Sequence, residues 1–357
     1  MLNPTYKVVI RMRGIAILLG CIGALIGVPA HAQEAPAPFY KGRQITIVIG
    51  SSPGGGYDTY GRLLGRHLGK HVPGNPSVVP ANMPGAGSNT AAAHVFNAAP
   101  KDGTYIGAIF AGVIVEPLLA ERSKAKFDPT KLVFVGNANN EVFVCAVRAN
   151  VPVKSLDDMK SRPVVLGASA AGGPTVDFPA MLNNVLGTTN KVVRGYPGTR
   201  EITLAIEKGE VDGACGFAWS TLSVQYPGTL QKGEPFRIVL QEDMTGHPVL
   251  NAAGVPFSGR FATNDADRQA LALFYAQNTF GRPYVMAPEV PAERIAAIRT
   301  AFMAAMKDPE LLAEAKRLNV DIIPSSGEQV QANVARMYAT PRDIVDRVKK
   351  ALSQSSK

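Results

Sequence analysis

Histidine and cysteine are scarce in this chain, and their scarcity limits the metal chemistry that the sequence can support. The 357 residues include three cysteines and five histidines, and structural zinc sites need several such ligands at short, regular spacing. His67, His71 and His94 have no partner at that spacing in a Cys/His cluster. We therefore expect no metal site.

Long hydrophobic runs are also missing, apart from one near the N-terminus that extends from Ile15 to Val28. The charges before this run are Lys7, Arg11 and Arg13, and the small-x-small signal after it is Ala30-His31-Ala32. Residues 1–32 are therefore predicted to be a secretory signal peptide, with a soluble, periplasmic mature chain that begins at Gln33. A membrane anchor and a lipoprotein site at Cys21 are the competing interpretations, but the run is short and stays apolar after Cys21.

Two cysteines remain beyond the signal peptide, Cys145 and Cys215, each in apolar surroundings. An exported chain could join them in a disulfide. We expect instead that both are buried as small hydrophobic residues.

The mature chain carries only a mild excess of positive charge. The formal net charge is +9, and it falls to +6 once the three basic residues of the signal peptide are removed. Arg62, Arg66 and Lys70 lie along one predicted helix face, and acidic residues are interleaved with basic ones elsewhere. This pattern is typical of a solvated surface. It predicts no nucleic-acid partner and only a general attraction for small anions.

Short apolar runs alternate with helical patterns along the mature chain, which is typical of parallel βα units. Ile45 to Ile49 is the first predicted strand, and a helix with apolar residues three and four positions apart follows it. Later predicted strands are Thr104 to Phe110 and Val142 to Arg148, and the predicted C-terminal helices are Asp265 to Asn278, Pro291 to Met306, Pro309 to Leu318 and Pro341 to Leu352.

One segment repeats the first strand, turn and helix. When "VVLGASAAGGPTVDFPAMLNNVLG" from residue 164 is laid under "IVIGSSPGGGYDTYGRLLGRHLG" from residue 47, strand, glycine turn and helix fall in one register. Ser169 then lies under Ser52, and Gly172-Gly173 lies under Gly55-Gly56. The repeat favours two domains built on the same plan.

Three glycine-rich turns are the candidate ligand site: Ser51 to Asp58, Gly85 to Asn89 and Ser169 to Thr175. Each leads from a strand to a helix, and ligands of open α/β sheets bind at the carboxyl ends of strands. Glycine lets the backbone approach a ligand closely, and the free amides of a helix N-terminus accept an anion. The three turns together predict an anion pocket. Asp58 either caps its own helix or contacts the ligand.

Nucleotide and hydrolase motifs fit this sequence poorly. The helix after the first turn starts Gly56-Tyr57-Asp58-Thr59, without the Gly-Lys-Ser/Thr of a phosphate loop and without the third glycine of a dinucleotide fingerprint. We expect no cofactor. Gly167 to Ala171 resembles a nucleophile elbow with the last glycine replaced, so a secreted serine hydrolase with Ser169 and His247 is a separate hypothesis.

Several motifs in order are similar to those of one family. They are "PGGGYDTYGRLLGRHL", "NMPGAGSNTAA", "APKDGTYIG", "GYPGTREITLAIEKGEVDG" and "VPAERIAAIRTAFMAAMKDPELLAEAKRLNV". From Phe39 to its C-terminus, the chain resembles the solute-binding receptors of tripartite tricarboxylate transporters, also called Bug receptors.

The resemblance implies an α/β fold of the type II periplasmic binding protein class, with two lobes that close over a ligand cleft. Lobe 1 would comprise residues 39–147 and 236–339, and lobe 2 residues 148–235, with hinge strands near Val144 to Asn150 and Phe236 to Gln241. The lobe that holds the C-terminal helix, residues 340–357, stays open.

The resemblance further implies a monomeric receptor, not an enzyme, that delivers a small carboxylate to integral-membrane permease subunits. A periplasmic sensor is the alternative function. The implied ligand-binding residues are Ser51, Ser52, Gly54, Gly55, Gly56, Asp58, Gly87, Ser88, Ser169, Ala170, Gly172, Gly173, Tyr196, Gly198 and Thr199. Pro197 replaces the lysine of the family's Tyr-Lys-Gly-Thr loop. Gly216 stands where amino-acid-binding members carry an aspartate, so an amino-acid ligand is disfavoured. Trp219 either lines the pocket or packs beside it.

Overall fold

Residues 39–51, 53–54, 56–120, 125–169, 173–196, 198–231 and 235–353 are described by the structure, which is a computed structural model. The predicted signal peptide, residues 1–32, lies outside these residues. From Glu34 onward the chain forms one compact unit. Among the described helices, none combines the length and the apolar character that a membrane span requires.

The first sheet contains the first predicted strand and orders its strands β11-β4-β10-β3-β1-β2. These strands are β1 (Gln44–Ile49), β2 (Ser77–Asn82), β3 (Tyr105–Ala108), β4 (Val133–Asn137), β10 (Pro283–Met286) and β11 (Ser325–Ser326). β1 pairs in parallel with β2 and β3, whereas β10 is antiparallel to β3 and β4. The carboxyl ends of β1 and β3 therefore meet at one edge of the sheet.

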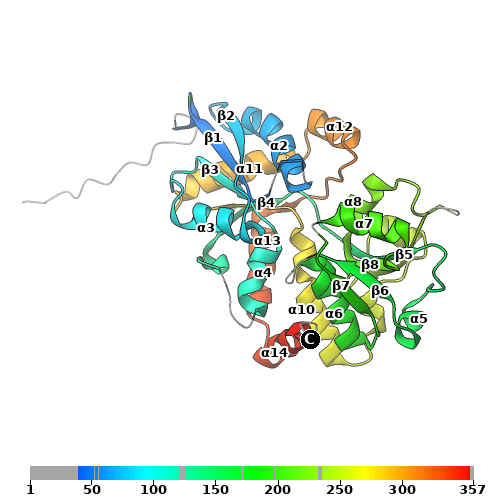
Figure 1. The fold of residues 1–357 in the computed structure, drawn as a ribbon. Coiled ribbons are helices and arrows are strands. Elements are labelled where there is room, and N and C mark those ends of the chain that lie inside the picture. The colour runs from blue at the N-terminus through cyan, green and yellow to red at the C-terminus, as the bar shows by residue number, and fades with distance from the viewer. Residues whose placement is uncertain are drawn as a thin grey trace, which may run out of the picture. The chain divides into compact units, whose positions relative to one another are not determined.

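The second sheet repeats the parallel core of the first and has the order β7-β6-β8-β5-β9. Its strands are β5 (Phe143–Arg148), β6 (Val165–Ala168), β7 (Lys191–Arg194), β8 (Gly213–Ala218) and β9 (Phe236–Glu242). β6 is parallel to β7 and β8, and β5 is antiparallel to β8 and β9. The two sheets confirm the predicted two-lobe α/β fold (Figure 1).

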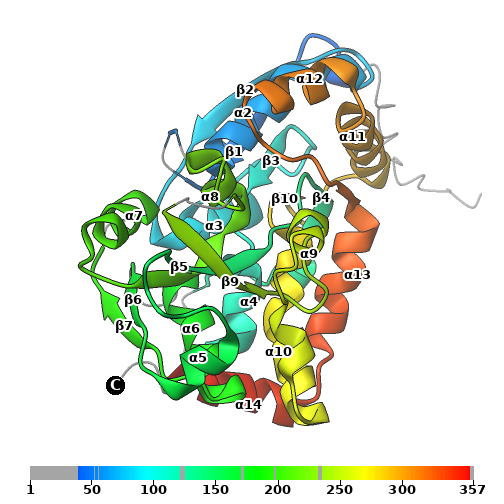
Figure 2. The same ribbon diagram turned by 90° about the vertical axis from the view of Figure 1, so that its right-hand side faces the viewer.

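Helices follow the strands and cover the sheets (Figures 1 and 2). Their bounds are α2 (Gly56–Leu68), α3 (Asn89–Asn97), α4 (Gly112–Leu119), α5 (Leu156–Ser161), α6 (Pro174–Leu186), α7 (Thr199–Lys208), α8 (Trp219–Gln225), α9 (Pro248–Ala252), α10 (Asp265–Tyr275), α11 (Ala292–Ala305), α12 (Pro309–Arg317), α13 (Gly327–Tyr338) and α14 (Arg342–Ser353). The predicted C-terminal helices are all present, with ends shifted by a few residues.

The crossing strands β5 and β9 both pair inside the second sheet. The sheets therefore divide the chain between β4 and β5 and again after β9, several residues away from the predicted lobe boundaries at 147 and 236. The last helix, α14, packs on α10, α6 and α4. Because α4 follows a strand of the first sheet and α6 a strand of the second, α14 contacts both lobes.

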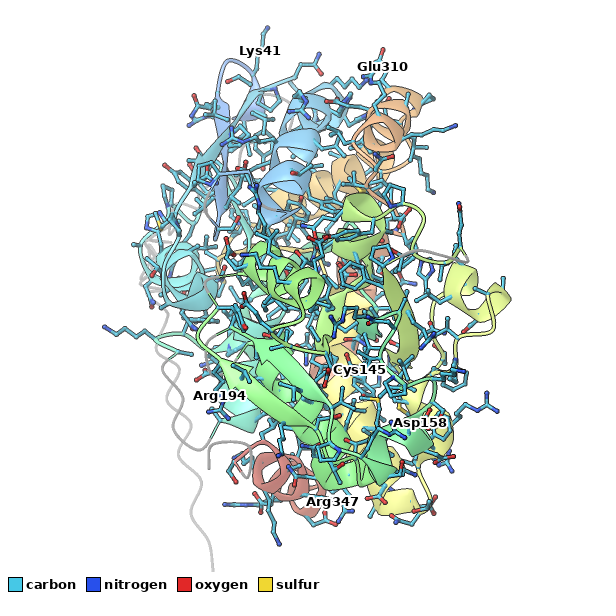
Figure 3. All side chains as sticks on the ribbon, turned by 45° about the vertical axis from the view of Figure 1, so that its right-hand side comes forward. Lys41, Cys145, Asp158, Arg194, Glu310 and Arg347 are labelled. Carbon is cyan, nitrogen blue, oxygen red and sulfur yellow. A yellow bond between two sulfur atoms is a disulfide. The ribbon has the colours of Figure 1, made fainter. Side chains whose placement is uncertain are left out.

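Cys145 and Cys215 form a disulfide, so the expectation of two unpaired cysteines was wrong. Cys145 lies on β5, where the pairing with β8 shifts register between Val144 and Ala146. This shift brings the two Cα atoms within 3.9 Å of each other. Figure 3 labels Cys145 among the strands of the second sheet. The two cysteines are 70 residues apart in sequence, and composition does not show which strand register brings such distant residues together.

Candidate functional site

Asp58 organises the first glycine turn from the third position of α2. Its side chain is buried and accepts hydrogen bonds from the Gly54 amide (2.8 Å), from Asn82 Nδ2 (2.8 Å) and from Arg62 Nε (2.9 Å to Oδ1). Asn82 Nδ2 also donates to the Ser51 carbonyl at 3.0 Å. Both ends of the turn are thus tied to one carboxylate, which favours a structural role at the start of α2 over ligand contact.

The charge of Asp58 is neutralised locally. Burial alone would raise its pKa, but hydrogen bonds from Arg62, Gly54 and Asn82 outweigh burial and lower the pKa below the ordinary value. Asp58 is therefore ionised at neutral pH and paired with Arg62. This pair adds no net charge to the turn.

The second turn has an unusual left-handed backbone. Gly85, Ala86, Gly87 and Ser88 all have positive φ, and two of them are not glycine. For Ala86 and Ser88 such a conformation costs about 1–3 kcal/mol each, and strained residues of this kind cluster at functional sites. Ser88 is buried, and its Oγ accepts a hydrogen bond from the Phe110 amide at 3.2 Å. The second turn is therefore held against the end of β3.

Gly50, at the end of β1, lets the first two turns approach each other. A Cβ atom at Gly50 would lie 1.8 Å from Ser88 Oγ, so a larger residue there would push the turns apart. The structure thus places the described part of the first turn beside Ser88 at the carboxyl edge of the first sheet, and the convergence of all three turns stays a prediction. Ser51 lies there too, with a buried hydroxyl that has no hydrogen-bond partner among the described atoms.

The matching edge of the second sheet carries the third turn and the turn after β7. The Ser169 amide donates to Thr175 Oγ1 at 3.0 Å, and the two hydroxyls are also 3.0 Å apart. The Tyr196 amide donates to the Ala168 carbonyl at 3.2 Å. Gly173 and Gly198 precede the first residues of α6 and α7, so the helices that follow the neighbouring parallel strands β6 and β7 both begin at this edge.

Four of the predicted ligand-binding residues, Ser52, Gly55, Ala170 and Gly172, lie outside the described residues. The others, which are Ser51, Gly54, Gly56, Asp58, Gly87, Ser88, Ser169, Gly173, Tyr196, Gly198 and Thr199, fall on the two sheet edges described above. Their contact with a ligand stays a prediction.

A buried ion pair that the sequence did not reveal connects the first turn to the second lobe. Arg282 Nη2 lies 3.0 Å from Glu141 Oε2, and the Arg282 guanidinium carbon lies 4.5 Å from the centre of the Tyr57 ring. A Cβ atom at Gly56 would lie 3.4 Å from Arg282 Nη2. Ser220, on α8, donates its hydroxyl to Glu141 Oε2 at 2.5 Å. Glu141 therefore joins the base of the first turn to α8.

Asp177 was also missed. It lies in the first turn of α6, immediately after the third glycine turn, and burial raises its pKa to about 7, against a smaller lowering by Arg194. An acid with such a pKa gains or loses its proton near neutrality. The position of Asp177 after a glycine turn was the only signal in the sequence.

The remaining candidates pack elsewhere. The Ser169 hydroxyl is hydrogen-bonded to Thr175, whereas His247 Nδ1 accepts from the Val249 amide at 3.3 Å. These contacts do not pair Ser169 with His247 as a serine hydrolase would require. Trp219 and His247 line a groove of about 480 Å³ together with residues of α12, and none of the described turn residues lines that groove.

Comparisons with known proteins bear on the fold. No protein-family model matches the sequence, and no curated protein matches it either. Solved structures do match. A TctC solute-binding protein from Polaromonas is 17% identical with a TM-score of 0.64, and the match covers 88% of this chain and 99% of that one. A Rhodopseudomonas palustris protein solved with adipate is 19% identical with a TM-score of 0.63, covering 86% and 97%.

A third solved structure, MatC from Rhodopseudomonas palustris with bound malate, is 19% identical with a TM-score of 0.57, and the match covers 85% of this chain and 99% of that one. All three matches extend over nearly the whole of the known chain. The chain therefore has the fold of the TctC-type periplasmic solute-binding proteins.

Proposed function

We propose that the protein is an extracytoplasmic receptor that binds a small carboxylate between its two lobes and delivers it to an integral-membrane permease. The observation that carries this proposal is the arrangement of the turns: helix N-termini gather at the carboxyl edge of each sheet, in a fold shared with solute-binding proteins. Helix N-termini present unpaired amides and a favourable dipole to an anion.

The charges near the turns support binding by amides and hydroxyls. Arg62 is paired with Asp58 and Arg282 with Glu141, so neither guanidinium offers an uncompensated charge to the ligand. Charge-assisted hydrogen bonds contribute about 1.5–3 kcal/mol each. A micromolar receptor needs about 8 kcal/mol in total. Four or five such contacts are sufficient after the cost of ordering the ligand.

Two observations narrow the ligand class to carboxylic acids without an ammonium group. Structures of this fold contain adipate and malate, both dicarboxylates. Gly216 has φ +65°, and a Cβ atom there would lie 2.1 Å from the Pro174 carbonyl oxygen, so this position cannot carry an acid that would bind an ammonium. We therefore choose dicarboxylates as the first ligands to test.

Isothermal titration calorimetry on the chain that begins at Gln33 tests the proposal, with adipate, malate and longer dicarboxylates as ligands. Gly54→Ala is the informative variant, because Gly54 has φ +84° and its amide is bonded to Asp58. Gly42→Ala is the matched control, with φ +72° and open space around it.

Alanine in the left-handed region costs about 1–2 kcal/mol. Relaxation of the first turn should therefore weaken binding about tenfold in Gly54→Ala and leave Gly42→Ala unchanged. Equal affinity in both variants would remove the first turn from the binding site. A protein that binds no carboxylate in the panel would contradict the proposed function itself.

A further inference from the structure

Two histidines and three acids face one another where the end of α2 meets α12, remote from the glycine turns. His67 Nε2 lies 2.7 Å from Glu314 Oε2, and His71 Nε2 lies 2.7 Å from Asp308 Oδ2. Lys70 Nζ lies 2.6 Å from a carboxylate oxygen of both Asp308 and Glu310. Figure 3 labels Glu310, which lies in the first turn of α12.

Three of these side chains are close enough to share one ion. Ligand atoms of His67, Asp308 and Glu310 all lie within 4.8 Å of one another. Zinc binds imidazole nitrogen and carboxylate oxygen at about 2.0–2.2 Å, which requires ligand atoms some 3.5 Å apart. His67 and Asp308 are buried and already fixed, whereas the Glu310 side chain is 77% exposed and can move by the remaining distance.

The surroundings of these ligands match those of metal sites. Glu314 holds the His67 imidazole through Nε2, and His71 holds the Asp308 carboxylate. Carboxylate–histidine contacts of this kind orient metal ligands and maintain their basicity. Asp308 Oδ2 also lies 2.6 Å from the Lys70 ammonium, so this carboxylate oxygen already binds a cation.

The cluster already holds a cation at its centre, the Lys70 ammonium. The Lys70 side chain is 42% exposed and can turn into solvent. Apart from the two imidazoles, three carboxylates face only two side-chain cations, Lys70 and Arg66. A divalent ion in place of the ammonium would remove this excess of negative charge.

We propose that His67, Asp308 and Glu310 form a binding site for a divalent transition metal ion, with Zn²⁺ as the probe, which the ion occupies in competition with Lys70. The site clamps α2 to α12 and does not depend on the carboxylate-receptor function. No metal site was expected from the sequence because only close Cys/His spacing was considered, whereas His67 and the pair Asp308 and Glu310 come from distant parts of the chain.

Zn²⁺ titration by calorimetry tests the site, with the chain that begins at Gln33, no carboxylate present and a non-chelating buffer. Glu310→Gln and His67→Gln should weaken Zn²⁺ binding about tenfold or more. Lys70→Met should strengthen it about tenfold, because the competing cation is gone. His94→Gln, on α3, is the control and should leave the affinity unchanged.

Lys70→Met should raise the Zn²⁺ affinity and Glu310→Gln should lower it. These opposite changes distinguish a specific site from non-specific binding of Zn²⁺ to surface carboxylates. The proposal is overturned if the wild-type protein takes up no Zn²⁺ at millimolar concentration, if Glu310→Gln and His67→Gln bind as the wild type does, or if Lys70→Met does not bind more tightly. Carboxylate affinity measured in the same variants should not change, which keeps this test separate from that of the receptor function.

Discussion

The buried carboxyl of Glu242 should make the stability of the protein depend on pH. Glu242 lies on β9 with no exposed surface; its Oε2 accepts the Gly216 amide at 2.5 Å, and its Oε1 has no partner among the described atoms. Burial raises its pKa to about 8, although the Gly216 hydrogen bond acts to lower it. The folded protein therefore keeps the Glu242 proton at pH values where the unfolded chain has lost it.

The direction of the pH effect follows from the difference in the Glu242 pKa between the folded and the unfolded chain. The stabilisation of the folded protein by the protonated Glu242 carboxyl is fully present below the unfolded pKa of 4.5 and is lost as the pH rises to about 8. One pKa unit corresponds to 1.36 kcal/mol. Glu242 should therefore reduce the free energy of unfolding by about 3–4 kcal/mol between pH 5 and pH 8. Asp177, with a pKa raised to about 7, adds a loss of the same sign over a lower range.

Glu242→Gln tests this reasoning, because glutamine keeps the acceptor for Gly216 and cannot ionise. We expect the variant to resemble the wild type near pH 5 and to exceed its free energy of unfolding by about 3–4 kcal/mol at pH 8. Urea unfolding at pH 5, 6.5 and 8 measures the difference. Glu289→Gln, at an exposed side chain, is the control. Parallel pH profiles for the wild type and Glu242→Gln would refute the assignment of a neutral buried carboxyl.

Three further sets of substitutions test other contacts that the structure shows. Asp58→Ala should weaken carboxylate binding about tenfold in calorimetry while circular dichroism stays unchanged, since both ends of the first turn lose their anchor; undiminished affinity would contradict this role. Joint replacement of Cys145 and Cys215 by serine should lower the free energy of unfolding in urea by about 2–4 kcal/mol, and an unchanged midpoint would argue against the disulfide. Arg282→Met should lower the free energy of unfolding by about 3–5 kcal/mol, because Glu141 is left buried without its cationic partner. Adding Glu141→Gln should recover part of that loss. A double variant no more stable than Arg282→Met would count against the ion pair.

The sequence predicted those parts of the fold that depend on neighbouring residues. Apolar runs and helical periodicity identified β1, α2, α10, α11, α12 and α14 but not α13, and the repeat correctly paired β1 and α2 with β6 and α6. It did not predict that β10, from residues 283–286, would insert between β3 and β4. Neither did it predict that β5 and β9 would pair inside the second sheet. Strand order depends on packing between distant segments, which local periodicity does not report.

In the candidate site, too, contacts between residues close in sequence were predictable and contacts between distant residues were not. Asp58 was predicted as a possible cap because it lies at the start of a helix, where a carboxylate can accept hydrogen bonds from free amides. The partnership of Arg282 with Glu141 could not be predicted, since the two residues are 141 positions apart and meet only after both sheets have formed. The disulfide between Cys145 and Cys215 was not predicted for the same reason, because its formation depends on the register between β5 and β8.

The neutralised charges around the first turn have a consequence for transport. A delivered ligand has to be released, and an unpaired buried guanidinium in direct contact with a carboxylate would hold it more tightly than backbone amides do. In this structure Asp58 neutralises Arg62, and Glu141 neutralises Arg282 directly beneath the turn. Arg282 therefore fixes the turn geometry through Tyr57 and Gly56 without adding its full charge to the binding energy. In the receptor function that we propose, the affinity is then set by the number of amides that the turns present, and opening the lobes removes those amides together.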